Sequence, residues 1–165
     1  MILFSDEAGV KLDADLCKMW APKGEQPLIV SHSPYGRLNL TGFVCPQRGY
    51  LMINCMEKGN AVNFINQLEQ VRDHYKEFEL KIYVDNAKWH KTKAVYDWIA
   101  KNPQIKLDFL PTYAPDANPM ERHWWYLRKK KLKNIVFENK SQCWAAIKVH
   151  IKDLSSDTIK TICKI

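Results

Sequence analysis

The sequence predicts an α/β fold, in which an antiparallel meander of strands and a set of parallel strands form one mixed sheet with helices on both faces. Three observations support this prediction. Short apolar runs separated by turn residues occupy much of the first 56 residues. From residue 60 onward, apolar residues recur at intervals of three and four, which is the period of an amphipathic helix. Short strands then alternate with helices, and strands joined in this way pair in parallel through right-handed crossovers.

The first part of the chain is predicted to consist of strands and turns. The opening apolar run ends at Asp6-Glu7-Ala8-Gly9, and the later runs are separated by turns at 33–36 and 46–49. Connections this short make neighbouring strands antiparallel. Residues 11–27 show no clear period, and residues 20–24 are predicted to form a loop. The predicted strands are Ile2–Ser5, Leu28–Ser31, Leu38–Cys45 and Tyr50–Met56.

The remainder alternates between helices and strands. Helices are predicted over 60–76, over 91–101, from Asn118-Pro119 through a basic segment, and over 141–153. Two strands lie between them, Leu80–Val84 before Asp85 and Ile105–Leu110 before the polar loop at 112–117. An antiparallel meander followed by parallel βα units is the pattern of a ribonuclease H-like fold.

Length and composition limit the class of protein. A chain of 165 residues that is 46% apolar fits a single domain with a sizeable core and is unlike a disordered chain. It contains neither a run long enough to span a membrane nor a secretory signal. The five cysteines are scattered without a C-x-x-C pair, which argues against a disulfide framework and a zinc ribbon. We therefore expect a cytoplasmic protein without a membrane partner.

The positive charge is concentrated in one segment. Residues 1–116 carry 14 basic and 14 acidic side chains, whereas residues 117–152 carry 9 basic and 2 acidic ones. The whole formal net charge of +7 therefore resides near the C-terminus. Such asymmetry favours a surface that binds a polyanion, of which nucleic acid is the commonest. A solvated basic helix face is the alternative, and the charge count leaves both open.

Three acidic residues stand at the ends of predicted elements. Asp6 follows the first strand, Asp85 follows the strand over 80–84, and Glu121 lies in the first turn of the helix that begins at Asn118-Pro119. Ligands collect beyond the carboxyl ends of strands in open α/β sheets, so adjacent strands would bring Asp6 and Asp85 together. Carboxylates this close require a cation or a proton between them, and a third makes an oxygen-rich site for Mg²⁺ or Mn²⁺. Two such ions roughly 3.5–4 Å apart can activate a water and stabilise the leaving oxygen of a phosphodiester.

Each acid also has a structural interpretation. Asp6 could be a turn residue, Asp85 could form an Asx-turn, and Glu121 could close a capping box with Asn118. Glu7 is expected on the opposite face of the strand, in a structural role. The pattern of a buried strand ending in Asp occurs twice and is followed by a helix-start Glu, and this combination favours the metal site.

Three motifs resemble those of bacterial mariner-like insertion-sequence transposases. Residues 83–90, Tyr-Val-Asp-Asn-Ala-Lys-Trp-His, resemble the second-aspartate motif of that family. Residues 110–121, Leu-Pro-Thr-Tyr-Ala-Pro-Asp-Ala-Asn-Pro-Met-Glu, followed by Trp124, resemble its third-acid motif, and residues 4–9 its first. Between Asp85 and Glu121 lie 35 residues, close to the spacing of the family.

This resemblance implies a DDE-type catalytic domain with a ribonuclease H-like fold. It implies that Asp6, Asp85 and Glu121 bind two divalent ions, Mg²⁺ or Mn²⁺. The implied reaction is hydrolysis at transposon ends, followed by attack of the freed 3′-hydroxyl on target DNA at a TA step. No covalent enzyme intermediate is expected, and the active complex is expected to be a homodimer associated with the nucleoid. His90 and Asn118 match recurring family positions, either to orient the acids or to contact DNA, although His90 could equally be a structural histidine at a helix start.

Family members carry an N-terminal helix-turn-helix region that reads the transposon ends. The first predicted strand begins at Met1, so we expect residues 1–165 to be a single catalytic domain without that region. Two other functions stay open at this point. One is a non-catalytic DNA-binding or assembly module derived from a transposase, and the other is a hydrolytic nuclease of the same fold.

The basic segment is the predicted contact with the DNA backbone. Cations in the helix that bears Glu121 could hold phosphates beside the metal site, whereas a helix dipole would explain only some of them. Met120, Trp124 and Leu127 recur at helical spacing and are predicted to be core. Trp89 and Trp125 could stack on bases, but we expect them to pack. The predicted DNA-backbone residues are Arg122, Arg128, Lys129, Lys130, Lys131 and Lys133.

Overall fold

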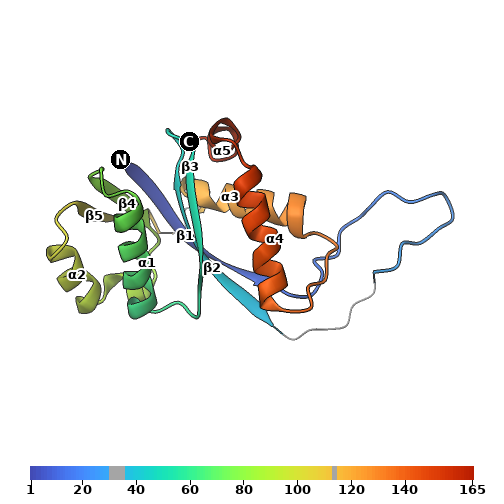
Figure 1. The fold of residues 1–165 in the computed structure, drawn as a ribbon, viewed down its shortest axis with the longest axis horizontal. Helices are drawn as coiled ribbons and strands as arrows, with labels where there is room; N and C mark the ends of the chain where they lie inside the picture. Colours follow the sequence, from blue (N-terminus) through green and yellow to red (C-terminus); the bar gives the residue numbers. More distant parts are fainter. Residues whose placement is uncertain (30–35, 113–114) are drawn as a thin grey trace.

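The computed structural model describes residues 1–29, 36–112 and 115–165, and it contains one five-stranded sheet flanked by helices (Figure 1). The strand order across the sheet is β3-β2-β1-β4-β5. β1 and β2, and likewise β2 and β3, pair antiparallel, whereas β4 pairs parallel with both β1 and β5. The predicted mixed sheet is therefore confirmed. The strands are β1 (Ile2–Lys11), β2 (Arg37–Cys45), β3 (Tyr50–Met56), β4 (Leu80–Val84) and β5 (Ile105–Phe109).

Helices cover both faces of the sheet, as predicted. α1 (Ala61–His74) and α2 (Lys93–Ala100) pack on one face, where Leu3, Ile82 and Phe64 belong to one buried cluster. α3 (Pro119–Leu127), α4 (Lys140–Asp153) and α5 (Ser156–Ile162) pack on the other face around Phe4 and Trp124. Figure 1 shows these two groups on opposite sides of β1 and β2. Neighbouring residues of β1 alternate between the two cores because successive side chains in a strand point to opposite faces.

The first strand is longer than the sequence predicted. β1 continues through Asp6 and Glu7 to Lys11, and its second half pairs with Gly42–Arg37 of β2. Ala8 and Val10 are buried on the α3 side, so the strand does not end at the two acids as predicted, because their backbone groups pair with β2. Asp6 is therefore an internal strand residue rather than a turn residue.

Other predicted elements differ in detail. Leu28 and Ile29 are not in a strand, and the rest of the predicted strand at 28–31 lies outside the described residues. The predicted helix over 91–101 is confirmed as α2 and is preceded by a 3₁₀ turn (Lys88–Lys91) that was not predicted; α5 was not predicted either. Another 3₁₀ turn spans Pro115–Ala117. The helix through the basic segment changes from α3 to a π-helical turn at Arg128–Leu132. Within the described ranges, no helix has the length and apolar character needed to cross a membrane.

A glycine in β2 sets how closely α3 approaches the sheet. Gly42 is the register partner of Asp6. A Cβ atom at Gly42 would overlap the Met120 side chain and lie 2.7 Å from Cζ2 of Trp124, and both of these α3 side chains are fully buried. The missing side chain therefore lets α3 lie directly against the strand pair that carries Asp6.

Gly42→Ala is expected to lower the free energy of unfolding by about 1–3 kcal/mol, because the buried Trp124 ring cannot move aside without repacking. Replacing glycine inside a strand would otherwise stabilise the protein by roughly 0.5–1 kcal/mol, since alanine loses less conformational freedom on folding. The two effects have opposite sign. Urea denaturation of the variant beside the wild type measures the difference, and an increase in stability would show that α3 is not held at this distance by Gly42.

Candidate active site

The three predicted acids lie where β1, β4 and α3 meet. Asp6 is in β1, Asp85 directly follows β4, and Glu121 is in the first turn of α3. β1 and β4 are hydrogen-bonded neighbours in the middle of the sheet, with Phe4 opposite Tyr83, so Asp6 and Asp85 each lie two residues beyond this last pair. Both Glu121 and Asp85 act electrostatically on Asp6. The three acids thus lie on adjoining elements, Asp6 and Asp85 on neighbouring strands and Glu121 in the helix packed against β1.

Asn118 fixes the start of α3 against β1. Its side-chain oxygen accepts a hydrogen bond from the backbone N–H of Met120 at 3.1 Å and caps the helix. Its side-chain nitrogen donates to the carbonyl oxygen of Ser5 at 3.0 Å. The side chain is buried, and Pro119 at the first helical position adds a preset backbone angle. One residue therefore joins the helix that bears Glu121 to the strand position directly before Asp6.

The electrostatics of Asp6 fit a bound cation. Burial, followed by the negative charges of Glu121, Glu7 and Asp85, raises the pKa of Asp6 to about 8. Its Oδ2 atom is buried without a hydrogen-bond partner among the described residues. A carboxyl group in this situation either holds a proton or is compensated by a cation. An all-oxygen set of carboxylates suits Mg²⁺ or Mn²⁺, so the residues present fit the ions that the sequence predicted.

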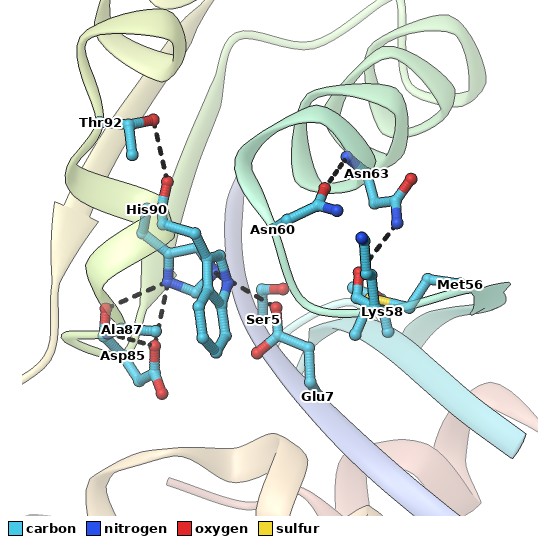
Figure 2. Close-up of polar contacts among 12 residues, drawn as sticks. Ser5, Glu7, Met56, Lys58, Asn60, Asn63, Asp85, Ala87, His90 and Thr92 are labelled. Carbon is cyan, nitrogen blue, oxygen red and sulfur yellow. Dashed lines mark hydrogen bonds and ion pairs between the residues drawn. The ribbon is translucent and has the colours of Figure 1, made fainter. Parts of the chain in front are cut away.

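A histidine connects Asp85 to a fourth acid (Figure 2). Nδ1 of His90 lies 3.0 Å from Oδ1 of Asp85, and Nε2 lies 3.2 Å from Oε1 of Glu7. The hydrogen bond from His90 is the main reason that the pKa of Asp85 is lowered. Glu7 lies on the opposite face of β1 from Asp6, as expected. The side chains of Glu7, Asp85 and His90 form a group in which the possible metal-ligand atoms lie within 4.8 Å of one another.

His90 is held in its charged form at neutral pH. Burial favours the neutral ring, but hydrogen bonds to Asp85 and Glu7 outweigh it and raise the pKa of His90 to about 9. Nε1 of Trp89 also lies 3.0 Å from Nε2 of His90. Trp89 donates in this contact, so it and Glu7 compete for Nε2: a protonated Nε2 donates to Glu7, and the Trp89 N–H must then turn away from it. The contact of Glu7 with His90 is not predictable from a local motif, because the two residues are 83 positions apart in the sequence.

The basic residues form an exposed surface beyond the acids. All six predicted DNA-backbone residues are exposed, and none forms an ion pair with any residue in the described ranges. A cavity of about 550 Å³ adjoins Glu121 on the exposed side of α3. Trp125 in its wall is 61% exposed, so the expectation that it packs in the core is wrong, whereas Trp89 does pack against a core cluster. The cavity is lined by Asp116, Asn118, Glu121, Arg122, Trp125, Tyr126 and Ile162.

The raised pKa of Asp6 predicts how the metal-free protein responds to pH. The folded state binds this proton with a pKa of about 8, against 3.8 in the unfolded chain, so the stabilisation is complete below pH 3.8 and is lost as the pH rises through 8. Asp6→Asn keeps the shape without the charge. At pH 8 without divalent ions it is expected to be more stable than the wild type by on the order of 2–4 kcal/mol.

Urea denaturation in a chelator at pH 4, 6 and 8 checks this prediction. The advantage of Asp6→Asn should shrink toward pH 4, where both side chains are uncharged. Saturating Mg²⁺ should reverse it, because only the wild type then gains the full set of ligands. A variant that is less stable than the wild type at pH 8 in the chelator would contradict the assigned repulsion.

Comparisons with known proteins agree with this geometry. A family model described as DDE superfamily endonuclease matches residues 1–144. An uncharacterized 39 kDa protein of insertion element IS630 from Shigella sonnei is 25% identical over 137 residues, which cover 81% of this chain and 39% of that protein. The chain thus spans well under half the length of this curated relative.

Solved structures share the fold. The Mos1 strand transfer complex matches with a TM-score of 0.72 at 17% identity, over 98% of this chain and 50% of that chain. The catalytic domain of Mos1 mariner transposase matches with a TM-score of 0.66 at 15% identity, over 98% of this chain and 74% of that chain. The fold is therefore the ribonuclease H-like fold of transposase catalytic domains. With the family model covering most of its length, the chain belongs to the DDE superfamily endonucleases.

Proposed function

We propose that this chain is the catalytic domain of a transposase that hydrolyses DNA phosphodiester bonds and transfers strands with two divalent ions. The observation that carries the proposal is the state of Asp6: Glu121, Glu7 and Asp85 place negative charge around it, and its buried Oδ2 has no partner in the described residues. Asp6, Asp85 and Glu121 would hold Mg²⁺ or Mn²⁺. Such ions activate a water or a 3′-hydroxyl and stabilise the leaving oxygen. Structures of Mos1 paired-end complexes with Mn and with Mg support this choice of metal.

The residues of the chain have separate roles in this proposal. Asp6 gives up its proton when the ions bind, since a cation replaces the proton that burial favours. His90 keeps Asp85 ionised. Asn118 holds α3 on β1, which keeps Glu121 beside Asp6. No side chain here needs to form a covalent intermediate, because the nucleophile is water or a DNA hydroxyl.

DNA is the proposed partner, at transposon ends and at a TA target. The exposed cations from Arg122 to Lys131 lie in the same helical segment as Glu121, Lys133 follows it directly, and all can neutralise phosphates near the acids. Phosphate contacts position DNA but do not read sequence, so recognition of the ends requires other contacts. Solved structures of similar fold include the Mos1 strand transfer complex and a Mos1 transposase paired-end complex with the left transposon end, and these support DNA as the partner.

A homodimer is the proposed active form. The segment of residues 13–29, here called the arm, is hydrogen-bonded to Asn134 through Asp15 and Cys17 and then extends away from the body of the domain (Figure 1). It exposes large apolar side chains, with Leu16 75%, Trp20 101% and Leu28 89% exposed. Exposed apolar groups gathered on one projecting segment are typical of a protein-interaction surface. A second copy of the chain is the partner that a paired-end reaction requires, since two ends are processed together.

Asp85→Asn tests the catalytic proposal. It removes one ligand charge but leaves an oxygen that still accepts the hydrogen bond from the Ala87 N–H, so the fold and DNA affinity should persist. Cleavage of end DNA in Mn²⁺ is expected to fall by more than about 100-fold, since even residues behind metal ligands contribute 10–100-fold.

Asp108→Asn is the matched control, because Asp108 is equally half-exposed but lies in β5 and pairs with Lys81. Its cleavage rate should stay at the wild-type level. Wild-type cleavage by Asp85→Asn would refute the metal site. Binding of end DNA without cleavage by the wild type would favour the non-catalytic module, and hydrolysis without strand transfer would favour a simple nuclease.

The basic surface is expected to bind DNA through phosphate contacts. DNA affinity should fall with salt with a log–log slope of about −0.9 per phosphate contact, and non-specific dissociation constants should be roughly 10⁻⁴–10⁻⁶ M. Replacing Arg128, Lys129, Lys130 and Lys131 by alanine should flatten that slope by up to about four contacts. Titration of two unrelated duplexes at several salt concentrations measures this. An unchanged slope would show that this turn is only a solvated basic face.

A further inference from the structure

Glu7 is a buried acid that the proposed reaction does not use. It lies in β1 next to Asp6, but the alternation of the strand places it toward α1 rather than α3. Its side chain is only 16% exposed, and its Oε1 atom is 3.2 Å from Nε2 of His90. An acid at such a position requires a partner, because burying an unpaired charge is costly. His90 is that partner.

His90 is fixed on every side. Its side chain is 2% exposed, and the ring of Phe64 from α1 lies 4.2 Å away, centroid to centroid. Nδ1 contacts Oδ1 of Asp85 at 3.0 Å, and Nε2 contacts Glu7. Figure 2 shows the imidazole between the two acids, one from β1 and the other from the end of β4. The ring cannot turn without breaking one of these contacts or moving Phe64.

The two carboxylate oxygens of Asp85 have different surroundings. Oδ1 accepts from His90 and also from the backbone N–H of Ala87 at 2.9 Å. Within the described ranges, Oδ2 has no hydrogen-bond donor that would compete with a cation. One oxygen is thus held by the protein and the other stays free. This division fixes the rotation of a carboxylate that is itself half-exposed.

We propose that Glu7 is a positioning residue, which acts through His90 to hold Asp85 with one oxygen available to a divalent ion. This inference rests on the proposed metal site of Asp6, Asp85 and Glu121. In metal sites, groups that orient a ligand from behind contribute to affinity almost as strongly as the ligands do. Glu7 would therefore act from the face of β1 opposite to Asp6 without touching the metal.

Direct ligation by Glu7 is the competing arrangement, since Glu7, Asp85 and His90 could surround one ion. Nδ1 of His90 faces Asp85 at 3.0 Å, and Nε2 faces Glu7 at 3.2 Å and Nε1 of Trp89 at 3.0 Å, so an ion could reach neither nitrogen without displacing one of these contacts. Mg²⁺ and Mn²⁺ also prefer oxygen ligands. The two arrangements differ in whether Glu7 needs His90 in order to have an effect.

A double-mutant cycle on Mn²⁺ binding separates them. The dissociation constant of Mn²⁺ from the metal-free chain is measured by electron paramagnetic resonance of free Mn²⁺, with thermal melts to verify folding. Glu7→Ala and His90→Phe, which keeps the ring volume against Phe64, are each expected to weaken binding by about 10–100-fold. The double variant should bind no more weakly than His90→Phe alone, because the two residues act as one unit. Glu7→Gln retains an acceptor for His90 and should restore most of the affinity.

Glu77→Ala is the control, because it removes an exposed acid beyond the far end of α1 and should not change Mn²⁺ binding. An equal loss on Glu7→Ala in the wild type and in His90→Phe would show direct ligation and overturn the inference, as would unchanged binding by Glu7→Ala. If His90→Phe does not fold, the comparison of Glu7→Ala with Glu7→Gln decides. Unchanged Mn²⁺ binding by Asp85→Asn would instead refute the proposed metal site itself.

Discussion

The hydrogen bonds of Asn118 are the constraint on which the site depends. One side chain caps α3 and also binds the carbonyl of Ser5, so the helix start and the strand cannot move independently. Glu121 lies three residues into the helix and Asp6 one residue beyond Ser5, and the cap therefore sets the relation between them. Gly42 of β2 also allows this arrangement, because it has no Cβ atom to collide with α3. The buried Trp124 and Met120 then fill the space.

The packing of α3 on β1 places several carboxylates near one another, and the repulsion between them is reduced in a different way on each face of β1. On the α1 side of β1, Glu7 and Asp85 share a protonated histidine, which neutralises part of their charge internally. On the α3 side, Asp6 has no such partner in the described part of the chain, and its pKa rises to about 8. The unfavourable energy is thus concentrated at the position where a divalent cation would relieve it. Sites that bind charged ligands commonly retain this kind of local instability.

The parts of the fold that sequence could predict are those encoded locally. Apolar runs located the sheet, and the period of three and four from Ala61 located α1. Asp85 and Glu121 were accessible because a strand end, an Asn-Pro helix start and an acid are adjacent in the chain. The role of Glu7 could not be predicted from the sequence, since it depends on a contact with His90, which lies in another element. The end of β1 was misplaced because the two acids look like a strand boundary, whereas their backbone groups pair with β2. Leu28 resembled a strand residue but lies exposed in the arm, where no neighbouring strand is present to pair with it among the described residues.

The most direct measurement of the central claim is anomalous diffraction from crystals of this chain grown with saturating Mn²⁺ and a DNA duplex. The account predicts Mn²⁺ density enclosed by the carboxylates of Asp6, Asp85 and Glu121, with Oδ2 of Asp85 as its ligand and Glu7 still bound to His90. Density held directly by Glu7 and His90 would contradict the account. So would the absence of any Mn²⁺ peak at these acids under saturating conditions.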